Sequence, residues 1–427
     1  MSVNLNTRGG VVYIDKFSSR KNVYWPFVIM GLLFNYIPEN LMTITILSAI
    51  VVIAIYTRGD LELKFPKLSV LLVLISLIGV VSGIANQELS KFGAYRFLRD
   101  SMYYLCPFLY WILGNAMGKS IKNKNVLWTT LFSASIASAL SILFVGFFLN
   151  WGDISLSTFP PNVLTVLAVA LCLFKPQEWI WAESRRQLVF FLTMIDLTAI
   201  VLSFSRTTLI CLLILLAIFA LRNLKALSRL MAGIALTIAV ALFAFQFMPQ
   251  NTIVQFTDKI NNSIDEISAN KNTWDDNYIN DDWRGYELFV AKQTFLAGNA
   301  QQQLLGYGFG YQLNLGANTL LVTDDSAGIP FLHNGYMSVL LKCGYVSLIL
   351  LCLFYFYHII RLLSIWVHTH SYQYGLAAGL VICVAVCSYI IHGIFIANSL
   401  WYLTVPLAIL HGFFIREPEV KKYNNMG

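Results

Sequence analysis

Residues Asn334–Tyr357 read NGYMSVLLKCGYVSLILLCLFYFY and contain a single charged residue, Lys342. As an α-helix this stretch would be about 36 Å long, enough to cross a hydrocarbon core about 30 Å thick. Apolar stretches of this kind recur from residue 23 to residue 415. The sequence therefore predicts an all-α polytopic membrane protein.

The composition agrees with this prediction, because 57% of the residues are hydrophobic and only 12% are charged. Soluble domains are typically about 25% charged. We predict about 12 transmembrane helices, with one large loop, residues 250–332, between the ninth and the tenth. The predicted segments are Val23–Ile37, Leu41–Tyr56, Leu68–Ile84, Ser101–Ala116, Leu127–Phe148, Pro161–Phe174, Gln187–Phe204, Thr207–Leu221, Leu230–Phe247, Asn334–Tyr357, Tyr374–Ile396 and Leu400–Ile415.

The net charge of +7 is explained by topology and does not indicate a nucleic-acid partner. With a cytoplasmic N-terminus, 20 of the 29 Lys and Arg residues fall on the cytoplasmic side, eight outside and one inside a helix. This asymmetry follows the positive-inside rule. We therefore predict cytoplasmic tails at 1–22 and 416–427, nine helices within 23–249, a periplasmic loop at 250–332 and three helices within 333–415.

The predicted outer loop carries ten acidic residues, several of them in pairs. Apolar spacing predicts amphipathic helices at Ile253–Ile267 and Trp283–Ala297, the second with an N-cap at Asp281–Asp282. We interpret the acidic residues as a solvated surface, and a divalent metal site is the alternative. The seven cysteines all lie in apolar segments, which favours small core residues over metal ligands.

Basic residues on the outer side are the exception here, and they are candidate substrate contacts. Arg206 lies in a very short connection and Arg284 in the large loop. Either guanidinium could grip a diphosphate through two parallel hydrogen bonds, or could simply snorkel to lipid headgroups. Lys91, Arg96 and Arg99 are further candidates, with a solvated connection as the alternative.

His333 opens the tenth predicted helix at its outer end, where an imidazole can act as a general base near neutral pH. The alternative is a packed interfacial histidine, and His392 is a second candidate base. Gly306-Tyr-Gly-Phe-Gly310 is either a tight turn that needs positive φ or a place where the backbone approaches a ligand.

Asp196 and Lys342 lie inside otherwise apolar segments, at similar depths of about 15 Å from the outer face. A charge at that depth needs a partner, so we predict a buried ion pair between them. The alternative is that each residue finds a separate polar partner.

Together these motifs resemble the O-antigen ligase and polymerase superfamily of bacterial membrane glycosyltransferases. The resemblance rests on Arg284, the Gly306–Gly310 turn, and His333-Asn334 followed after nine residues by Gly344. The turn around Arg206 and the large outer loop fit the same layout. Ser347 stands where family members often have a glycine.

The resemblance implies glycan transfer from undecaprenyl diphosphate to a sugar hydroxyl at the periplasmic face of the bacterial inner membrane. It implies His333 as the base, Arg206 and Arg284 as diphosphate ligands, and inversion without a metal or cofactor. Asn334, Gly308 and Gly310 are additional candidate contacts. The implied partners are a lipid-linked oligosaccharide, a glycan acceptor, the bilayer and a chain-length regulator.

We favour a repeat-unit polymerase as the function. An O-antigen ligase, which transfers the glycan to the lipid A core, is the alternative within the family. A lipid-linked oligosaccharide flippase is the alternative of a different class. Transporters often carry internal repeats and sites at the bilayer midplane, whereas the distinctive residues here cluster at the outer face.

Overall fold

The computed structural model describes residues 7–8, 11–12, 23–56, 65–88, 91, 93–149, 162–174, 176, 178–203, 205–220, 228, 231, 235, 279, 283–316, 328–396 and 400–414. Most of the predicted ninth segment lies outside these residues, as do the predicted helix at Ile253–Ile267, the Asp281–Asp282 cap and the C-terminal tail. The predicted N-terminal tail is described only at a short strand pair, Thr7–Arg8 (β1) with Val11–Val12 (β2).

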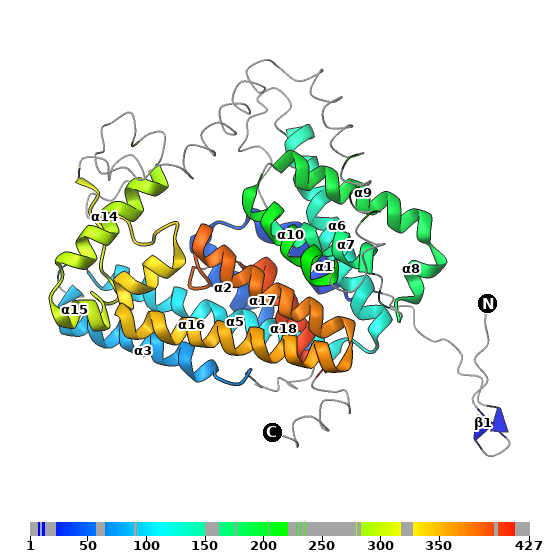
Figure 1. Cartoon of the computed structure of the whole chain (residues 1–427), viewed down its shortest axis with the longest axis horizontal. Coiled ribbons are helices and arrows are strands. Elements are labelled where there is room, and N and C mark those ends of the chain that lie inside the picture. The colour runs from blue at the N-terminus through cyan, green and yellow to red at the C-terminus, as the bar shows by residue number, and fades with distance from the viewer. Residues whose placement is uncertain are drawn as a thin grey trace.

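Helices make up the rest of the regular structure in the described residues, as the sequence predicts (Figure 1). The first half contains α1 (Trp25–Leu33), η1 (Phe34–Tyr36), α2 (Glu39–Tyr56), α3 (Ser69–Ala85), α5 (Ala94–Ser120), α6 (Lys124–Phe144) and η2 (Val145–Leu149). Next come η3 (Val163–Thr165), α7 (Val166–Phe174), α8 (Ile180–Ser184), α9 (Arg186–Ser203) and α10 (Arg206–Ala220). The remaining helices are α14 (Trp283–Ala297), α15 (Ala300–Leu305), α16 (Gly335–Thr369), α17 (Tyr372–Ile390) and α18 (Trp401–Phe414).

Four of the described helices are long and apolar enough to cross a membrane, and they lie within α6–η2, α9, α16 and α17. Five shorter apolar helices lie within α2, α3, η3–α7, α10 and α18. The protein is thus an all-helical membrane protein, while the number of twelve spans remains a prediction.

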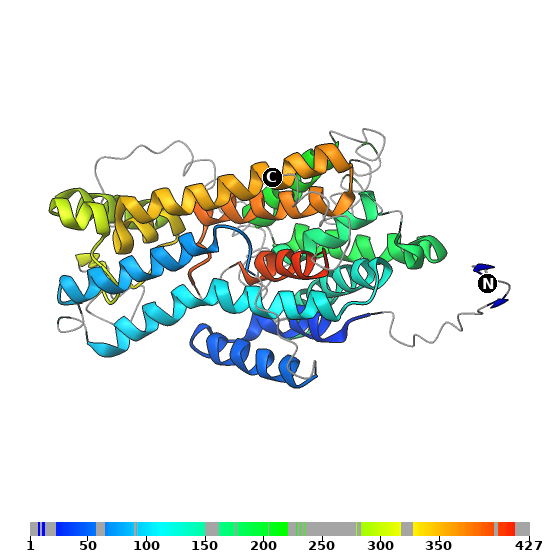
Figure 2. The ribbon, with the colours of Figure 1, turned by 90° about the horizontal axis from the view of Figure 1, so that it is seen from below.

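The long helices run side by side, with α16 packed against α17 and α3 (Figure 2). α18 packs closely on α5 because glycines remove side chains from their contact. A Cβ atom on Gly114 would lie 2.7 Å from the Val405 carbonyl oxygen, and one on Gly118 would lie 2.2 Å from that of Ile409. Small residues at such contacts let helix backbones approach within a membrane.

α14 and α15 lie at one end of the bundle, beside the first turns of α16 (Figure 1). α14 matches the amphipathic helix predicted at Trp283–Ala297. Its buried face contributes Ala291 and Phe295 to a separate apolar cluster, which also contains Met337 and Leu341 of α16. This cluster fixes α14 against the segment that carries His333.

Candidate active site

His333 lies immediately before α16 and is held by a buried carboxylate from α14. The backbone N–H of His333 donates to Glu287 Oε1 (2.8 Å), and His333 Nδ1 lies 2.7 Å from Glu287 Oε2. The Glu287 side chain is 2% exposed, whereas that of His333 is 34% exposed. Because a carboxylate only accepts hydrogen bonds, the neutral imidazole carries its proton on Nδ1. Its Nε2 atom is then the basic nitrogen.

His392 lies beyond the end of α17 and packs against His333, with ring centroids 4.6 Å apart. The two segments approach closely at Gly335 and Gly393, where a Cβ on Gly335 would lie 2.3 Å from the Gly393 Cα. His392 Nδ1 lies 2.8 Å from the Leu332 carbonyl oxygen. Burial, followed by the neighbouring His333, lowers the pKa of His392 to about 4. His392 is therefore a neutral imidazole near pH 7.

Arg284 lies on α14 one turn before Glu287, and its side chain is exposed. Residues three apart on a helix share a face. The positive charge of Arg284 contributes, as the smallest of several causes, to the lowered pKa of His392. The helix that carries Arg284 thus also supplies Glu287, the carboxylate that holds His333.

Arg206 is the first residue of α10, which packs against α17. Cys211 Sγ lies 3.2 Å from Cys387 Sγ, and residues further along α10 meet earlier residues of α17. The two helices are therefore antiparallel. Arg206 precedes this contact by five residues and His392 follows it by five, so both lie at the same end of the bundle. The Arg206 side chain is partly exposed.

A cavity of about 390 Å³ lies beside His392, and several polar side chains line it. Arg99 lines this cavity. Its Nη2 atom donates to Gln312 Oε1 (3.3 Å), and its Cζ atom lies 5.9 Å from the centroid of the Phe331 ring. The other lining residues are Tyr95, Tyr103, Pro330, Phe331, His392 and Ile396. Of the basic residues predicted to contact substrate, Arg99 is the one that lines this cavity.

Lys342 is buried and forms its ion pair with Asp100 of α5, not with Asp196 as we predicted. Lys342 Nζ also donates to the Tyr311 carbonyl oxygen (3.3 Å) and lies 4.5 Å from the Phe331 ring centroid. The Asp100 carboxylate accepts from the Gly310 N–H (2.8 Å). This network joins α5, α16 and the segment after α15 beneath the cavity that Arg99 lines.

Asp196 has a polar partner of its own. This was the alternative to the ion pair that the sequence left open. Its Oδ2 atom accepts from Ser135 Oγ of α6 (3.1 Å), and its side chain is fully buried. The predicted pair was wrong because α5 begins at Ala94, seven residues before the predicted segment. Asp100 therefore lies within a helix and reaches Lys342, whereas the sequence placed it in a connection.

The glycine segment Gly306–Gly310 is a turn inserted between helix backbones. All three of its glycines have positive φ, between +81° and +96°. A Cβ on Gly308 would lie 1.9 Å from the Gly83 nitrogen, and the Phe309 N–H donates to the Gly79 carbonyl (2.9 Å). Gly308 and Gly310 therefore pack against other segments of the protein. This supports the interpretation of the segment as a tight turn, and not the alternative that its backbone approaches a ligand.

Asn334 and Gly344 of the predicted motif have structural roles. The Asn334 side chain caps α16 by accepting from the Met337 N–H (2.9 Å). Gly344 interrupts α16 with φ of +73° and ψ of −177°, a region open almost only to glycine. A Cβ there would lie 2.2 Å from the Leu304 carbonyl oxygen. The nine-residue spacing thus separates the helix cap from the kink where α15 packs.

Lys91 and Arg96 are not among the residues that line the cavity beside His392. The exposed Lys91 Nζ lies 3.2 Å from Glu88 Oε1, a buried carboxylate after α3. Arg96 is partly exposed in the first turn of α5. For Lys91 the geometry fits the solvated-connection alternative, because its charge already has a carboxylate partner.

No group of three or more His, Cys, Asp or Glu side chains that could hold a metal ion occurs among the described residues. The acidic pairs Asp275–Asp276, Asp281–Asp282 and Asp324–Asp325 lie outside them. Cys211 and Cys387 lie in contact but are free thiols within the helix core. The residues that meet around His333 suit acid–base chemistry and anion binding.

Sequence reasoning missed Glu287, which we had counted with the solvated acidic residues of the loop. Its spacing from Arg284 was the available signal, because a helical pattern places the two on one face. Asp100 was missed for a different reason, since the predicted start of its helix was too late. Its position one residue before an apolar segment gave little indication of burial.

Comparison with known families agrees with the motifs. Residues 188–352 match the family described as O-antigen ligase, a range that includes Arg206, Arg284, Glu287 and His333. No curated protein matches the chain. This match supports the resemblance of the chain to the superfamily of O-antigen ligases and polymerases.

Proposed function

We propose that the protein is a repeat-unit polymerase of the bacterial inner membrane. It would transfer a glycan from undecaprenyl diphosphate to a sugar hydroxyl on another lipid-linked unit, at the periplasmic face. The observation that carries this proposal is the pairing of His333 with the buried Glu287 beside Arg284. This pairing supplies an oriented base next to a cation, as the transfer requires.

Glu287 holds the Nδ1–H of His333, so Nε2 faces the acceptor as a free base. As the acceptor oxygen attacks the anomeric carbon, Nε2 takes the hydroxyl proton. The bond between the anomeric carbon and the diphosphate oxygen breaks on the opposite side, which inverts the anomeric centre. Buried Glu287 stabilises the imidazolium that forms, because its carboxylate lies 2.7 Å from the ring.

The leaving diphosphate gains negative charge as this bond breaks. Arg284 and Arg206 lie at the end of the bundle that holds His333, and we assign them to the diphosphate. Cations that meet charge as it develops lower the barrier to reaction. Diphosphate is a good leaving group, so this mechanism uses neither a metal nor a cofactor. Arg99 and Tyr103 would line the space for a sugar, and a chain-length regulator would be a further partner.

The O-antigen ligase is the second candidate, because the matching family carries that description. It uses the same donor and the same base, and differs in an acceptor on the lipid A core. The polymerase and the ligase therefore predict the same residues but different glycans on the cell surface.

Deletion of the gene, followed by analysis of the surface glycan, distinguishes these functions. Single repeat units on the core would support the polymerase. A bare core with accumulated lipid-linked polymer would support the ligase instead, and repeats trapped on the cytoplasmic side would indicate a flippase. Complementation with His368→Ala, an exposed histidine at the far end of α16, should restore the wild-type glycan.

A further inference from the structure

A second cavity lies at the other end of the bundle from His333. It has a volume of about 670 Å³, within the range of roughly 300–1,000 Å³ typical of ligand pockets. Helices α3, α5, α16, α17 and α18 and the residues before α3 line it, and its walls are mainly apolar. Aromatic side chains provide much of the lining, namely Phe65, Phe108, Trp111, Phe354, Tyr355, Tyr374 and Phe414.

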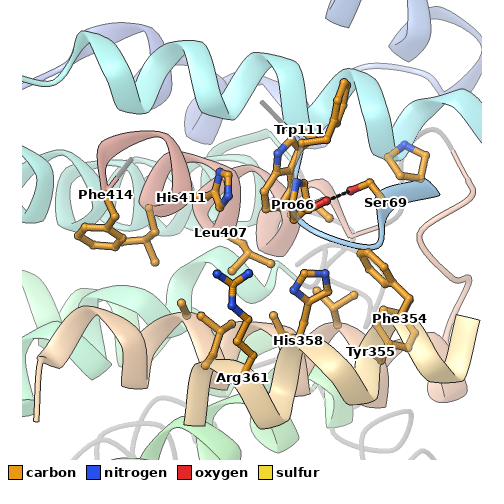
Figure 3. A pocket seen from close by; sticks show the side chains of 18 of the residues that line it. Pro66, Ser69, Trp111, Phe354, Tyr355, His358, Arg361, Leu407, His411 and Phe414 are labelled. Carbon is orange, nitrogen blue, oxygen red and sulfur yellow. Dashed lines mark hydrogen bonds between the residues drawn. The ribbon is translucent and has the colours of Figure 1, made fainter. Parts of the chain in front are cut away.

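Three basic side chains line this apolar cavity. Figure 3 shows Arg361 and His358 of α16 on one wall and His411 of α18 on the other. His411 Nδ1 lies 3.3 Å from Asn115 Oδ1. His358 is 9% exposed, and its buried Nε2 atom has no hydrogen-bond partner among the described residues. None of the described residues that line the cavity is acidic.

The depth of Arg361 matches a lipid headgroup. Arg361 follows His333 by 28 residues, at most about 42 Å at helical rise, because α16 is kinked at Gly344. A bilayer with its headgroup regions is about 40–45 Å thick. If His333 lies at one membrane surface, Arg361 lies near the other, while Phe354 lies about 10 Å closer to the bilayer centre. Phe65 lines the cavity and is itself 38% exposed at the protein surface.

We propose that this cavity binds an anionic phospholipid from the leaflet opposite the His333 site. The phosphate lies at Arg361 and His358, where the guanidinium supplies charge and the imidazole supplies a hydrogen bond. An acyl chain runs from there along Phe354 and Phe108 towards the bilayer centre. The site is separate from the proposed glycan transfer, so its occupancy does not depend on that function.

Native mass spectrometry of the full chain tests this proposal. The protein is released from nanodiscs that contain equal amounts of phosphatidylglycerol and phosphatidylcholine. We expect the wild type to retain one phosphatidylglycerol in preference to phosphatidylcholine, and Arg361→Gln to weaken this preference about tenfold. Lys122→Gln removes the same charge from an exposed position outside the cavity and should retain the lipid.

A photoactivatable phosphatidylglycerol provides a test on the wild type, independent of the folding of any variant. Its cross-links should map to residues 354–365 and 407–414. Equal retention of the two lipids by the wild type would overturn the proposal. So would undiminished phosphatidylglycerol binding in Arg361→Gln, or cross-links confined to other surfaces.

Discussion

At the residue scale, Glu287 decides which nitrogen of His333 carries the proton. Glu287→Gln places an amide beside the ring, and its NH₂ group would favour the tautomer with the proton on Nε2. We expect kcat to fall about 100-fold or more with little change in KM, because the base is lost and substrate contacts are kept. Steady-state kinetics of glycan transfer measure both constants.

Glu183→Gln is the matched control, since it removes an exposed carboxylate of α8. It should leave both constants unchanged. A Glu287→Gln enzyme with wild-type kcat would show that Glu287 serves only to hold the loop before α16.

His392 predicts a pH dependence of stability. Its pKa is about 4 in the folded protein and about 6.5 in an unfolded chain, so the unfolded state binds more protons between these values. Stability should therefore fall as the pH drops from 7 to 5, by up to about 2 kcal/mol from this residue. His392→Gln should lose that part of the dependence, measured as the change in melting temperature between the two pH values. Equal changes in both proteins would contradict the assignment.

At the element scale, the kink of α16 depends on Gly344. Gly344→Ala should destabilise the protein strongly, because the backbone needs positive φ and the added Cβ meets the Leu304 carbonyl. Gly316 is a useful control, since it also has positive φ (+68°) but nothing within 4 Å of an added Cβ. Gly316→Ala should cost only about 1–2 kcal/mol of backbone strain. Similar melting temperatures for the two variants would show that the α15 contact is unimportant.

The Asp100–Lys342 pair should couple α5 to α16. Removing Asp100 leaves the buried Lys342 without its carboxylate, which typically costs 3–5 kcal/mol. Lys342→Met should cost less, because Asp100 keeps Arg99 at 3.4 Å. We expect Asp100→Asn to lower the melting temperature more than the double variant Asp100→Asn with Lys342→Met does. The control is Asp196→Asn with Lys342→Met, which should show no such recovery because these residues are not paired. Recovery in the control and not in the first pair would reverse the assignment.

These elements show how far the sequence could predict the structure. Apolar spacing placed α14 at Trp283–Ala297, because an amphipathic helix repeats its apolar residues at helical intervals. Apolar spacing placed the start of α5 too late, because the polar residues before Ser101 are typical of a loop between helices. The principle that a buried charge needs a partner was correct for Lys342. The choice of partner was wrong, since helix neighbours are set by packing that the sequence does not display.

At the scale of the whole molecule, composition was enough to predict an all-helical membrane protein. The sequence predicted the candidate site only in part. The histidine and arginine motifs pointed to His333 and Arg284, and the structure places a buried carboxylate of the Arg284 helix, Glu287, against His333. Glu287, His392 and Asp100 contribute through contacts between segments far apart in the chain, so their roles become visible only once the helices are packed. The twelve-span topology remains a prediction.

The central claim is that His333 is the base for glycan transfer. The most direct test is the transfer rate of the purified full chain, reconstituted with an undecaprenyl-diphosphate-linked repeat unit. The claim predicts that His333→Ala reduces this rate to about 1% of wild type or less while the protein remains folded. His368→Ala, on the same helix, should keep the full rate. A His333→Ala protein that extends chains at a rate close to wild type would contradict the claim.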